Sequence, residues 1–168
     1  SSQSAVPSAL LERQAEETIE DGTVITLARG IRLAPAAGSA YSVRQSDAGR
    51  IVVALRRGAL WSAVDPKTKA ALLSIETPRG VVDVKGTVFA VEIADAAVTV
   101  KVLRGKVEVR ESGGAVRYVS AGQALVMGAP RVEEMDEPAL SEARGVVAAL
   151  GLALVGAAFL FMLGLNLN

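Results

Sequence analysis

The stretch VTVKVLRGKVEVRESGGAVRYVS, residues 98–120, decides the fold class of this chain. Valines alternate with polar residues on both sides of Gly105, and a period of two places such valines on one face of a β-strand. The segment ESGG (111–114) has the composition of a hairpin turn. We therefore expect a strand on each side of Gly105 and a third after the turn. The valines are Val98, Val100, Val102, Val107 and Val109.

The surrounding region, residues 21–130, has the same character. Short Val, Ile, Leu and Thr runs are broken by Gly, Pro, Asp and Ser, and the runs 51–55 and 87–93 are almost wholly apolar. Such runs are typical of strands covered on both sides. No long helical pattern separates them, which argues against a parallel sheet with crossover helices. The sequence predicts a mainly β domain.

A weak repeat of glycines indicates the shape that we expect for this domain. Glycines recur at strand-to-strand corners, often after Arg, at intervals on the order of 20–30 positions, as stacked β-coils would require. We predict a short irregular β-solenoid or β-roll, with a β-sandwich as the alternative. The glycines are Gly30, Gly58, Gly80, Gly105 and Gly122.

The composition excludes several kinds of chemistry. The chain contains no His and no Cys, which removes the commonest general base, thiol nucleophiles, disulfides and ordinary zinc sites. Lys plus Arg and Asp plus Glu both total 18, so no net field gathers nucleic acid. No Gly-rich phosphate loop is present. We expect a protein that is not an enzyme, with no cofactor, no metal, no nucleic-acid partner and no small-molecule substrate.

The end of the chain predicts a membrane helix. Residues 145–165 carry no charge, and at ~1.5 Å per residue such a run can cross a ~30 Å hydrocarbon core. Asp136 can cap the helix, and Pro138 is tolerated in its first turn. The alternative is a helix buried in the domain. The expected organisation is an arm with a short helix (1–20), the β domain (21–130), a charged neck (131–144) and the transmembrane helix (145–165).

One face of this helix carries only small residues, which lets another helix approach closely. We expect self-association or packing against a partner helix there. This helix-packing face consists of Gly145, Ala149, Ala153 and Ala157.

The sequence carries opposing signals for the side of the membrane on which the β domain lies. Arg131 and Arg144 precede the helix and no basic residue follows it, which favours a cytoplasmic domain by the positive-inside rule. Glu133 and Glu134 in the neck favour the opposite side, because an anionic cytoplasmic leaflet repels them. The chain begins with Ser1 rather than Met, so we expect a processed or trimmed product, and a removed signal peptide is one reason for that.

Four segments in order resemble the FecR domain, a family named for a bacterial regulator of iron-citrate uptake. They are TPRG (77–80), VKGTVFAV (84–91), the strand pair at 98–109 and VSAGQ (119–123). The resemblance implies a periplasmic, solenoid-like β domain at the bacterial inner membrane. Regulators of this family receive a signal from an outer-membrane transporter and control a sigma factor. In them the membrane helix precedes the domain, whereas here it follows.

The motif residues of this resemblance have structural explanations. The glycines suit corners, Phe89 suits the core, and Thr87 and Gln123 can hydrogen-bond turn backbones. Trp61 is either a core residue or a partner contact, together with Arg56 and Arg57. The motif residues are Thr77, Pro78, Gly80, Gly86, Thr87, Phe89, Gly105, Gly122 and Gln123.

Taken together, these features predict a non-catalytic, membrane-anchored, extracytoplasmic protein-interaction module. We expect a subunit or assembly factor of a bacterial envelope complex, single-pass in the inner membrane, with its β domain on the periplasmic side. Its expected partners are the lipid bilayer and other envelope proteins, including a second copy through the helix. The alternative is a FecR-like transmembrane signalling regulator of the sigma/anti-sigma type.

Overall fold

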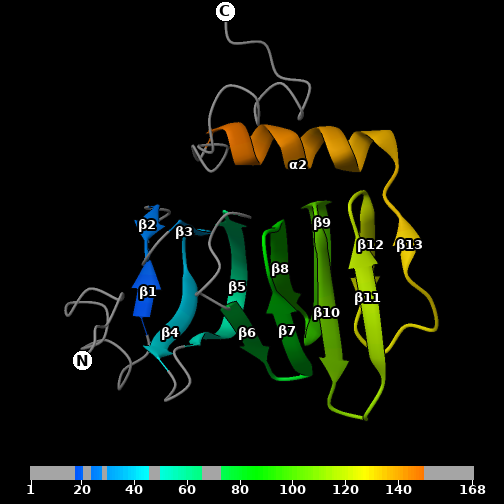
Figure 1. Cartoon of the computed structure of the whole chain (residues 1–168), viewed down its shortest axis with the longest axis horizontal. Coiled ribbons are helices and arrows are strands. Elements are labelled where there is room, and N and C mark those ends of the chain that lie inside the picture. The colour runs from blue at the N-terminus through cyan, green and yellow to red at the C-terminus, as the bar shows by residue number, and fades with distance from the viewer. Residues whose placement is uncertain (1–17, 21–23, 28–29, 46–49, 66–72, 150–168) are drawn as a thin grey trace, which may run out of the picture.

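A single long strand organises the molecule. β5 (Ile51–Val64) pairs through its first half with β4 and β6, and through its second half with β3 and β8. The sheet therefore curls around β5 into two facing halves, shaped like a half-barrel, with one helix lying across it (Figure 1). Half A contains β1, β4, the start of β5, β6, β7, β10 and β11. Half B contains β2, β3, the end of β5, β8, β9, β12 and β13.

The computed structural model describes residues 18–20, 24–27, 30–45, 50–65 and 73–149. The predicted mainly β class is confirmed. The other strands are β1 (Thr18–Glu20), β2 (Ile25–Thr26), β3 (Ile31–Pro35), β4 (Ser39–Gln45), β6 (Leu73–Thr77), β7 (Gly80–Val84), β8 (Val88–Ala94), β9 (Ala97–Arg104), β10 (Lys106–Glu111), β11 (Val116–Ser120), β12 (Gln123–Val126) and β13 (Glu133–Glu134), and the helix is α2 (Glu137–Ala149).

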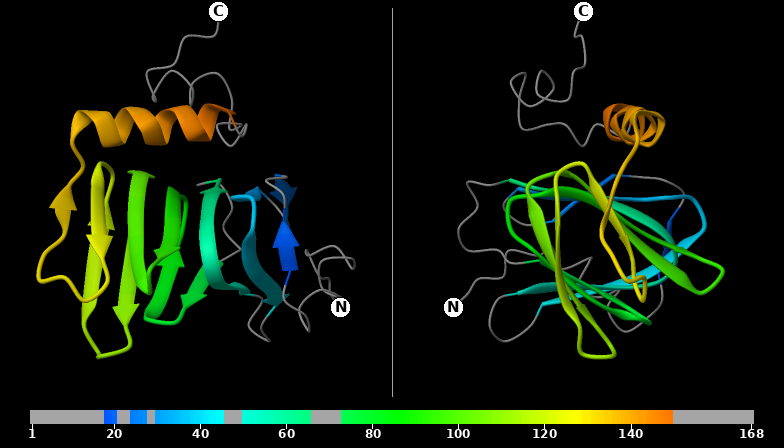
Figure 2. Two further views of the ribbon diagram at one scale, coloured as in Figure 1. Left: turned by 180° about the vertical axis from the view of Figure 1, so that it is seen from behind. Right: turned by 90° about the vertical axis from the view of Figure 1, so that its right-hand side faces the viewer.

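The two halves of the sheet face each other (Figure 2), and the hydrophobic core takes its side chains from both. Alternation along β9 and β10 directs their valines inward, where each is at most 1% exposed. Phe89 on β8 and Tyr41 on β4 are the largest fully buried side chains of this core. A burial of this kind stabilises the domain by about 1.5–3 kcal/mol for each large apolar side chain.

The prediction of stacked β-coils is corrected by the strand pairing. Among the described strands only β5 and β6 pair in parallel, and every other pairing is antiparallel. Stacked coils need parallel neighbours, whereas the short connections of this chain favour antiparallel ones. Several repeating glycines mark the places where the chain passes between the halves: Gly58 within β5, Gly105 between β9 and β10, and Gly122 between β11 and β12.

Gly58 shows why such a passage needs glycine. Its φ is +88°, and a Cβ at this position would lie 2.3 Å from Ser39 Oγ. Ser39 is fully buried and fixed, because its Oγ donates to Ala59 O and accepts from Ala59 N, both at 3.0 Å. Any larger residue would push β4 away from the bend in β5.

The helix lies against the domain along its described length. Asp136 caps it, since Asp136 Oδ1 accepts from Ala139 N at 3.0 Å, and Val147 is fully buried against half B. Within the ranges described, no helix is long and apolar enough to cross a membrane. Residues 145–149 of the predicted span are the end of α2, because an apolar sheet surface is available to the helix there; residues 150–165 lie outside the described residues, as does the arm up to residue 17.

Candidate functional site

The outer face of half B is apolar and is covered by the chain itself. Trp61 is only 6% exposed, and small side chains around it give α2 a flat surface on which to lie. Trp61 therefore contacts the chain's own helix, while Arg56 and Arg57 are exposed before the bend in β5. Their role as partner contacts stays a prediction. The sheet residues of this cluster are Ala34, Trp61, Ala63, Val88 and Ala90, and the helix adds Ala143 and Val147.

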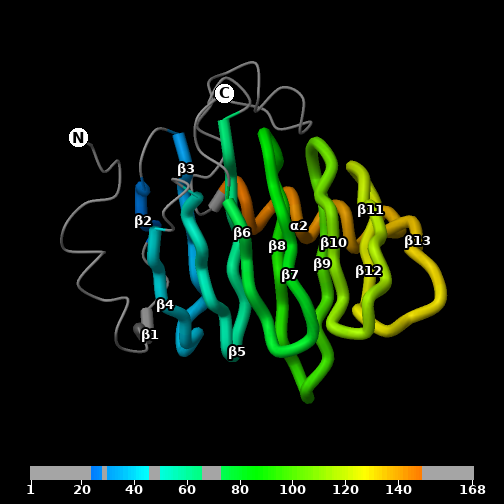
Figure 3. The backbone as a smooth tube through the Cα atoms, turned by 60° about the horizontal axis from the view of Figure 1, so that its bottom comes forward, coloured from blue at the N-terminus to red at the C-terminus, as the bar shows by residue number. Residues whose placement is uncertain are grey.

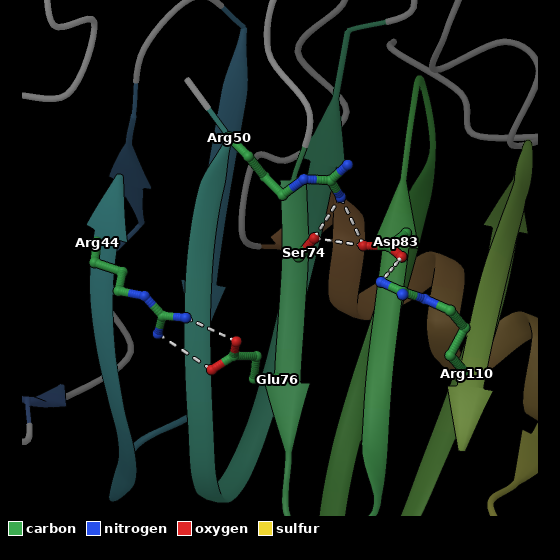
Figure 4. Close-up of polar contacts among 6 residues, drawn as sticks. All are labelled: Arg44, Arg50, Ser74, Glu76, Asp83 and Arg110. Atoms are coloured by element: carbon green, nitrogen blue, oxygen red, sulfur yellow. Dashed lines mark hydrogen bonds and ion pairs between the residues drawn. The ribbon is translucent and has the colours of Figure 1, made fainter. Parts of the chain in front are cut away.

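The outer face of half A carries a network of charged side chains instead (Figure 4). Asp83 on β7 lies at its centre, with its side chain 16% exposed. Arg50 Nη1 donates to Asp83 Oδ1 and to Ser74 Oγ, both at 2.7 Å, and Arg110 on β10 forms an ion pair with Asp83 Oδ2. Ser74 Oγ also donates to Asp83 Oδ1. Ser74 from the neighbouring strand and two arginines distant in sequence thus meet at one carboxylate.

A second ion pair lies on the same face. Arg44 on β4 donates to both carboxylate oxygens of Glu76 on β6, at 3.2 and 2.8 Å. These hydrogen bonds, together with the negative charge of Glu76, raise the pKa of the Arg44 guanidinium above its ordinary value. Arg44 therefore stays charged at any physiological pH.

Beside Asp83 the face is hollowed into an open pocket of about 270 Å³. Lys106 Nζ lies 5.4 Å from the centroid of the Tyr118 ring, and Tyr118 Oη donates to Glu108 Oε2 at 3.4 Å. Among the described residues, neither Lys85 nor Lys106 forms an ion pair. The pocket thus places these two ammonium groups beside the carboxylate of Glu108. Its lining is Arg50, Asp83, Val84, Lys85, Lys106, Val107, Glu108 and Tyr118.

The motif residues lie at turns and in the core rather than around this pocket. Thr77 Oγ1 accepts from Gly80 N at 3.1 Å in the turn that contains Pro78. Thr87, next to Gly86, is buried and donates to Lys85 O and Lys106 O at 3.1 and 3.2 Å.

Two further motif positions hold the crossings between the halves. Gln123 Oε1 accepts from Ser120 N at 2.9 Å beside Gly122. Gly105 has a φ of +84°, and a Cβ there would lie 2.9 Å from Gly86 O.

The predicted helix-packing face is seen only at its start. Gly145 is exposed, and nothing lies within 4 Å of the position a Cβ would take. The Ala149 side chain, Ala153 and Ala157 lie outside the described residues. This face stays a prediction.

Sequence reasoning missed the charged network of half A. Its members occupy outward positions between buried valines, as in β7 and β10, and that alternation is visible in the sequence. The sequence does not show which strands are neighbours in the sheet. In the structure β6 and β7 lie between β5 and β10, and this order brings the charged residues of these strands together. Within the described ranges, no cluster of acidic side chains is suited to a metal ion.

Comparison with known proteins gives the following matches. The family model described as FecR protein matches residues 11–108, more than half of the chain. The match begins before the motifs that carry the resemblance and ends before Gly122 and Gln123. No curated protein matches the sequence.

Two crystal structures of a protein from Parabacteroides distasonis ATCC 8503, described as a "putative anti-sigma factor", have a similar fold. At 1.65 Å resolution the match has a TM-score of 0.61 at 19% identity, and covers 78% of this chain and 64% of that one. At 2.50 Å resolution the TM-score is 0.59 at 19% identity, with 77% and 63% covered. The matched part is therefore less than two-thirds of the Parabacteroides chain.

Proposed function

The chain belongs to the FecR protein family, and from this premise we propose that it is a signalling module that regulates a sigma factor through protein–protein contacts. The family is non-catalytic, as the composition predicts. The match over residues 11–108 carries the proposal. The fold shared with the Parabacteroides protein supports it, because that protein is described as a "putative anti-sigma factor".

This proposal takes up the alternative drawn from the sequence. The first expectation, a subunit or assembly factor of an envelope complex, has support only from the predicted anchor. In both hypotheses the chain is a module that acts by binding another protein.

The outer face of half A is the surface we assign to that binding. It is uncovered in the described part of the molecule, whereas α2 occupies the equivalent face of half B. Its two ammonium groups without ion pairs, Lys85 and Lys106, give it a preference for acidic partners. Ion pairs hold Arg50, Asp83 and Arg110 in place.

A co-purification in mild detergent tests the regulator. We expect a sigma factor, or a protein that controls one, to be recovered with the full chain, and deletion of the gene to change transcription from promoters of that sigma factor. Recovery of stoichiometric envelope subunits, with unchanged transcription, would contradict the proposal. The double variant Lys85→Glu with Lys106→Glu should weaken the recovery, and Arg131→Glu, at an exposed position outside this face, should not.

We place the domain on the periplasmic side, as is typical of the family. The chain contains no Cys, so Ser112→Cys in the exposed turn between β10 and β11 introduces a single reporter thiol. With the outer membrane permeabilised, a membrane-impermeant thiol reagent should label intact cells. Labelling only after lysis of the inner membrane would place the domain in the cytoplasm.

The membrane anchor is a separate proposal, supported by the uncharged run 145–165, most of which (150–165) follows the helix α2 that lies on half B. The full chain should sediment with membranes and resist extraction by carbonate. A chain that ends at Ala149 should be released while keeping α2 on half B. Release of the full chain by carbonate would contradict the anchor.

A further inference from the structure

β11 is the end strand of half A, and in the described part of the chain its outer edge is hydrogen-bonded to no other strand. It pairs with β10 in antiparallel register, with Val116 opposite Arg110 and Ser120 opposite Lys106. A strand at a sheet edge presents backbone N–H and C=O groups that can pair with another chain.

The hydrogen-bond phase of the hairpin shows which groups are open. Glu111 N donates to Ala115 O at 2.8 Å, so this pair is hydrogen-bonded and the pairs alternate from there. Arg117 and Val119 therefore direct their backbone groups toward β10, which lies beside β11 (Figure 3), while Val116 and Tyr118 direct theirs outward. Ser120 N also points outward.

That last amide fixes where the open edge ends. Ser120 N donates to Gln123 Oε1, so the chain itself satisfies it. The open N–H groups of this edge are thus those of Val116 and Tyr118.

The side chains at these two positions are unusual for an edge. Val116 is 50% exposed and Tyr118 is 55% exposed, and they are among the most exposed large hydrophobic residues of the described chain. Edge strands are ordinarily protected by lysine, proline or a bulge. β11 has neither lysine nor proline, its register with β10 is regular, and the charge of Arg117 is held by Glu111.

The charges decide between a second copy and a different partner. Lys106 reaches over Tyr118 on the outer face without forming an ion pair, so an acidic residue on an added strand would find a cation there. A second copy of this chain brings no such residue, because its β11 (VRYVS) carries no Asp or Glu.

We propose that β11 is a docking edge to which an extended, acidic segment of a partner protein adds as a new strand of half A. The backbone of Val116 and Tyr118 forms the hydrogen bonds. An apolar residue of the partner packs on the exposed side chains, and an Asp or Glu pairs with Lys106. The inference rests on the proposed function only in requiring a protein partner.

A labelled synthetic peptide that alternates valine and threonine around one glutamate tests the edge, using the full chain in mild detergent. We expect saturable binding by fluorescence anisotropy and slower hydrogen exchange at the Val116 and Tyr118 amides. Val116→Pro removes an outward N–H without removing a bond to β10, so it should weaken binding by about tenfold. Val116→Thr keeps the N–H and serves as the matched control.

A second variant keeps the test decisive if Val116→Pro unfolds the domain. Lys106→Glu should reduce binding of the glutamate peptide and favour the same peptide with lysine in its place. Equal binding by Val116→Pro, no protection of the two amides, or a dimer through β11 would each overturn the inference. The sigma-factor recovery is measured independently, so a failed peptide test leaves the proposed function standing.

Discussion

The outer faces of the two halves of the sheet differ in their side chains and in what packs on them. Half B presents small apolar residues and Trp61, and α2 covers them. Half A presents ion pairs centred on Asp83 and stays uncovered in the described molecule (Figure 4). Both faces belong to the same curled sheet and share β5 and the same core. The comparison teaches that a face becomes a packing surface or a recognition surface according to the residues at its outward positions.

The largest effect is expected where the halves are joined. Gly58→Val should lower the free energy of unfolding by more than about 3 kcal/mol, because the residue needs a φ of +88° and its Cβ would overlap Ser39. Chemical denaturation measures this. Gly113→Ala, in an exposed turn where a Cβ meets nothing, should be nearly neutral. If the two variants had similar free energies of unfolding, glycine would not be required where β5 passes between the halves.

Breaking the cover of half B should come next. Val147→Asp places a carboxylate in a fully buried position and should cost about 2–3 kcal/mol by detaching α2. Trp61 is the only tryptophan, so its fluorescence reports the exposure of this face directly. We expect a red shift with the β-sheet circular dichroism retained. An unchanged spectrum would mean that α2 does not shield Trp61.

The crossing between β9 and β10 gives a slightly smaller effect. Gly105→Val should destabilise the domain by about 2 kcal/mol, because its φ is +84° and its Cβ would crowd Gly86 O and Thr87 Oγ1. Thermal unfolding followed by circular dichroism measures the change. A neutral result would show that this crossing tolerates an ordinary residue.

Changes on the open face should cost little stability. Asp83→Asn removes the charge that Arg50 and Arg110 share and should lower the unfolding free energy by about 1 kcal/mol. Adding salt should reduce the difference between the two proteins. A loss as large as that of Val147→Asp would show that this network supports the fold rather than a partner.

The smallest effect is expected at the exposed ion pair. Arg44→Ala should change stability by less than about 0.5 kcal/mol, since both partners are well exposed to solvent. This variant separates partner binding from stability. If co-purification shows weaker partner binding while chemical denaturation shows an unchanged free energy of unfolding, the face of half A is a recognition surface.

Several elements of this protein follow from local patterns in its sequence. Alternating valines in 98–109 specify strands, since a period of two has one face to bury, and glycine specifies the crossings because other residues resist positive φ. Asp136 specifies the start of the helix. These are local properties, and each follows from residues close together in the chain.

The contacts between these elements, in contrast, depend on how the strands pair. The parallel pairing of β5 with β6 and the placing of β7 beside β10 brought Arg50, Asp83 and Arg110 together, and neither arrangement follows from local pattern. The apolar start of the predicted span, residues 145–149, was equally compatible with lipid or with a sheet, because hydrophobic burial has no direction. The flat apolar surface around Trp61 settled that choice for α2, and it exists only when the strands of half B lie side by side.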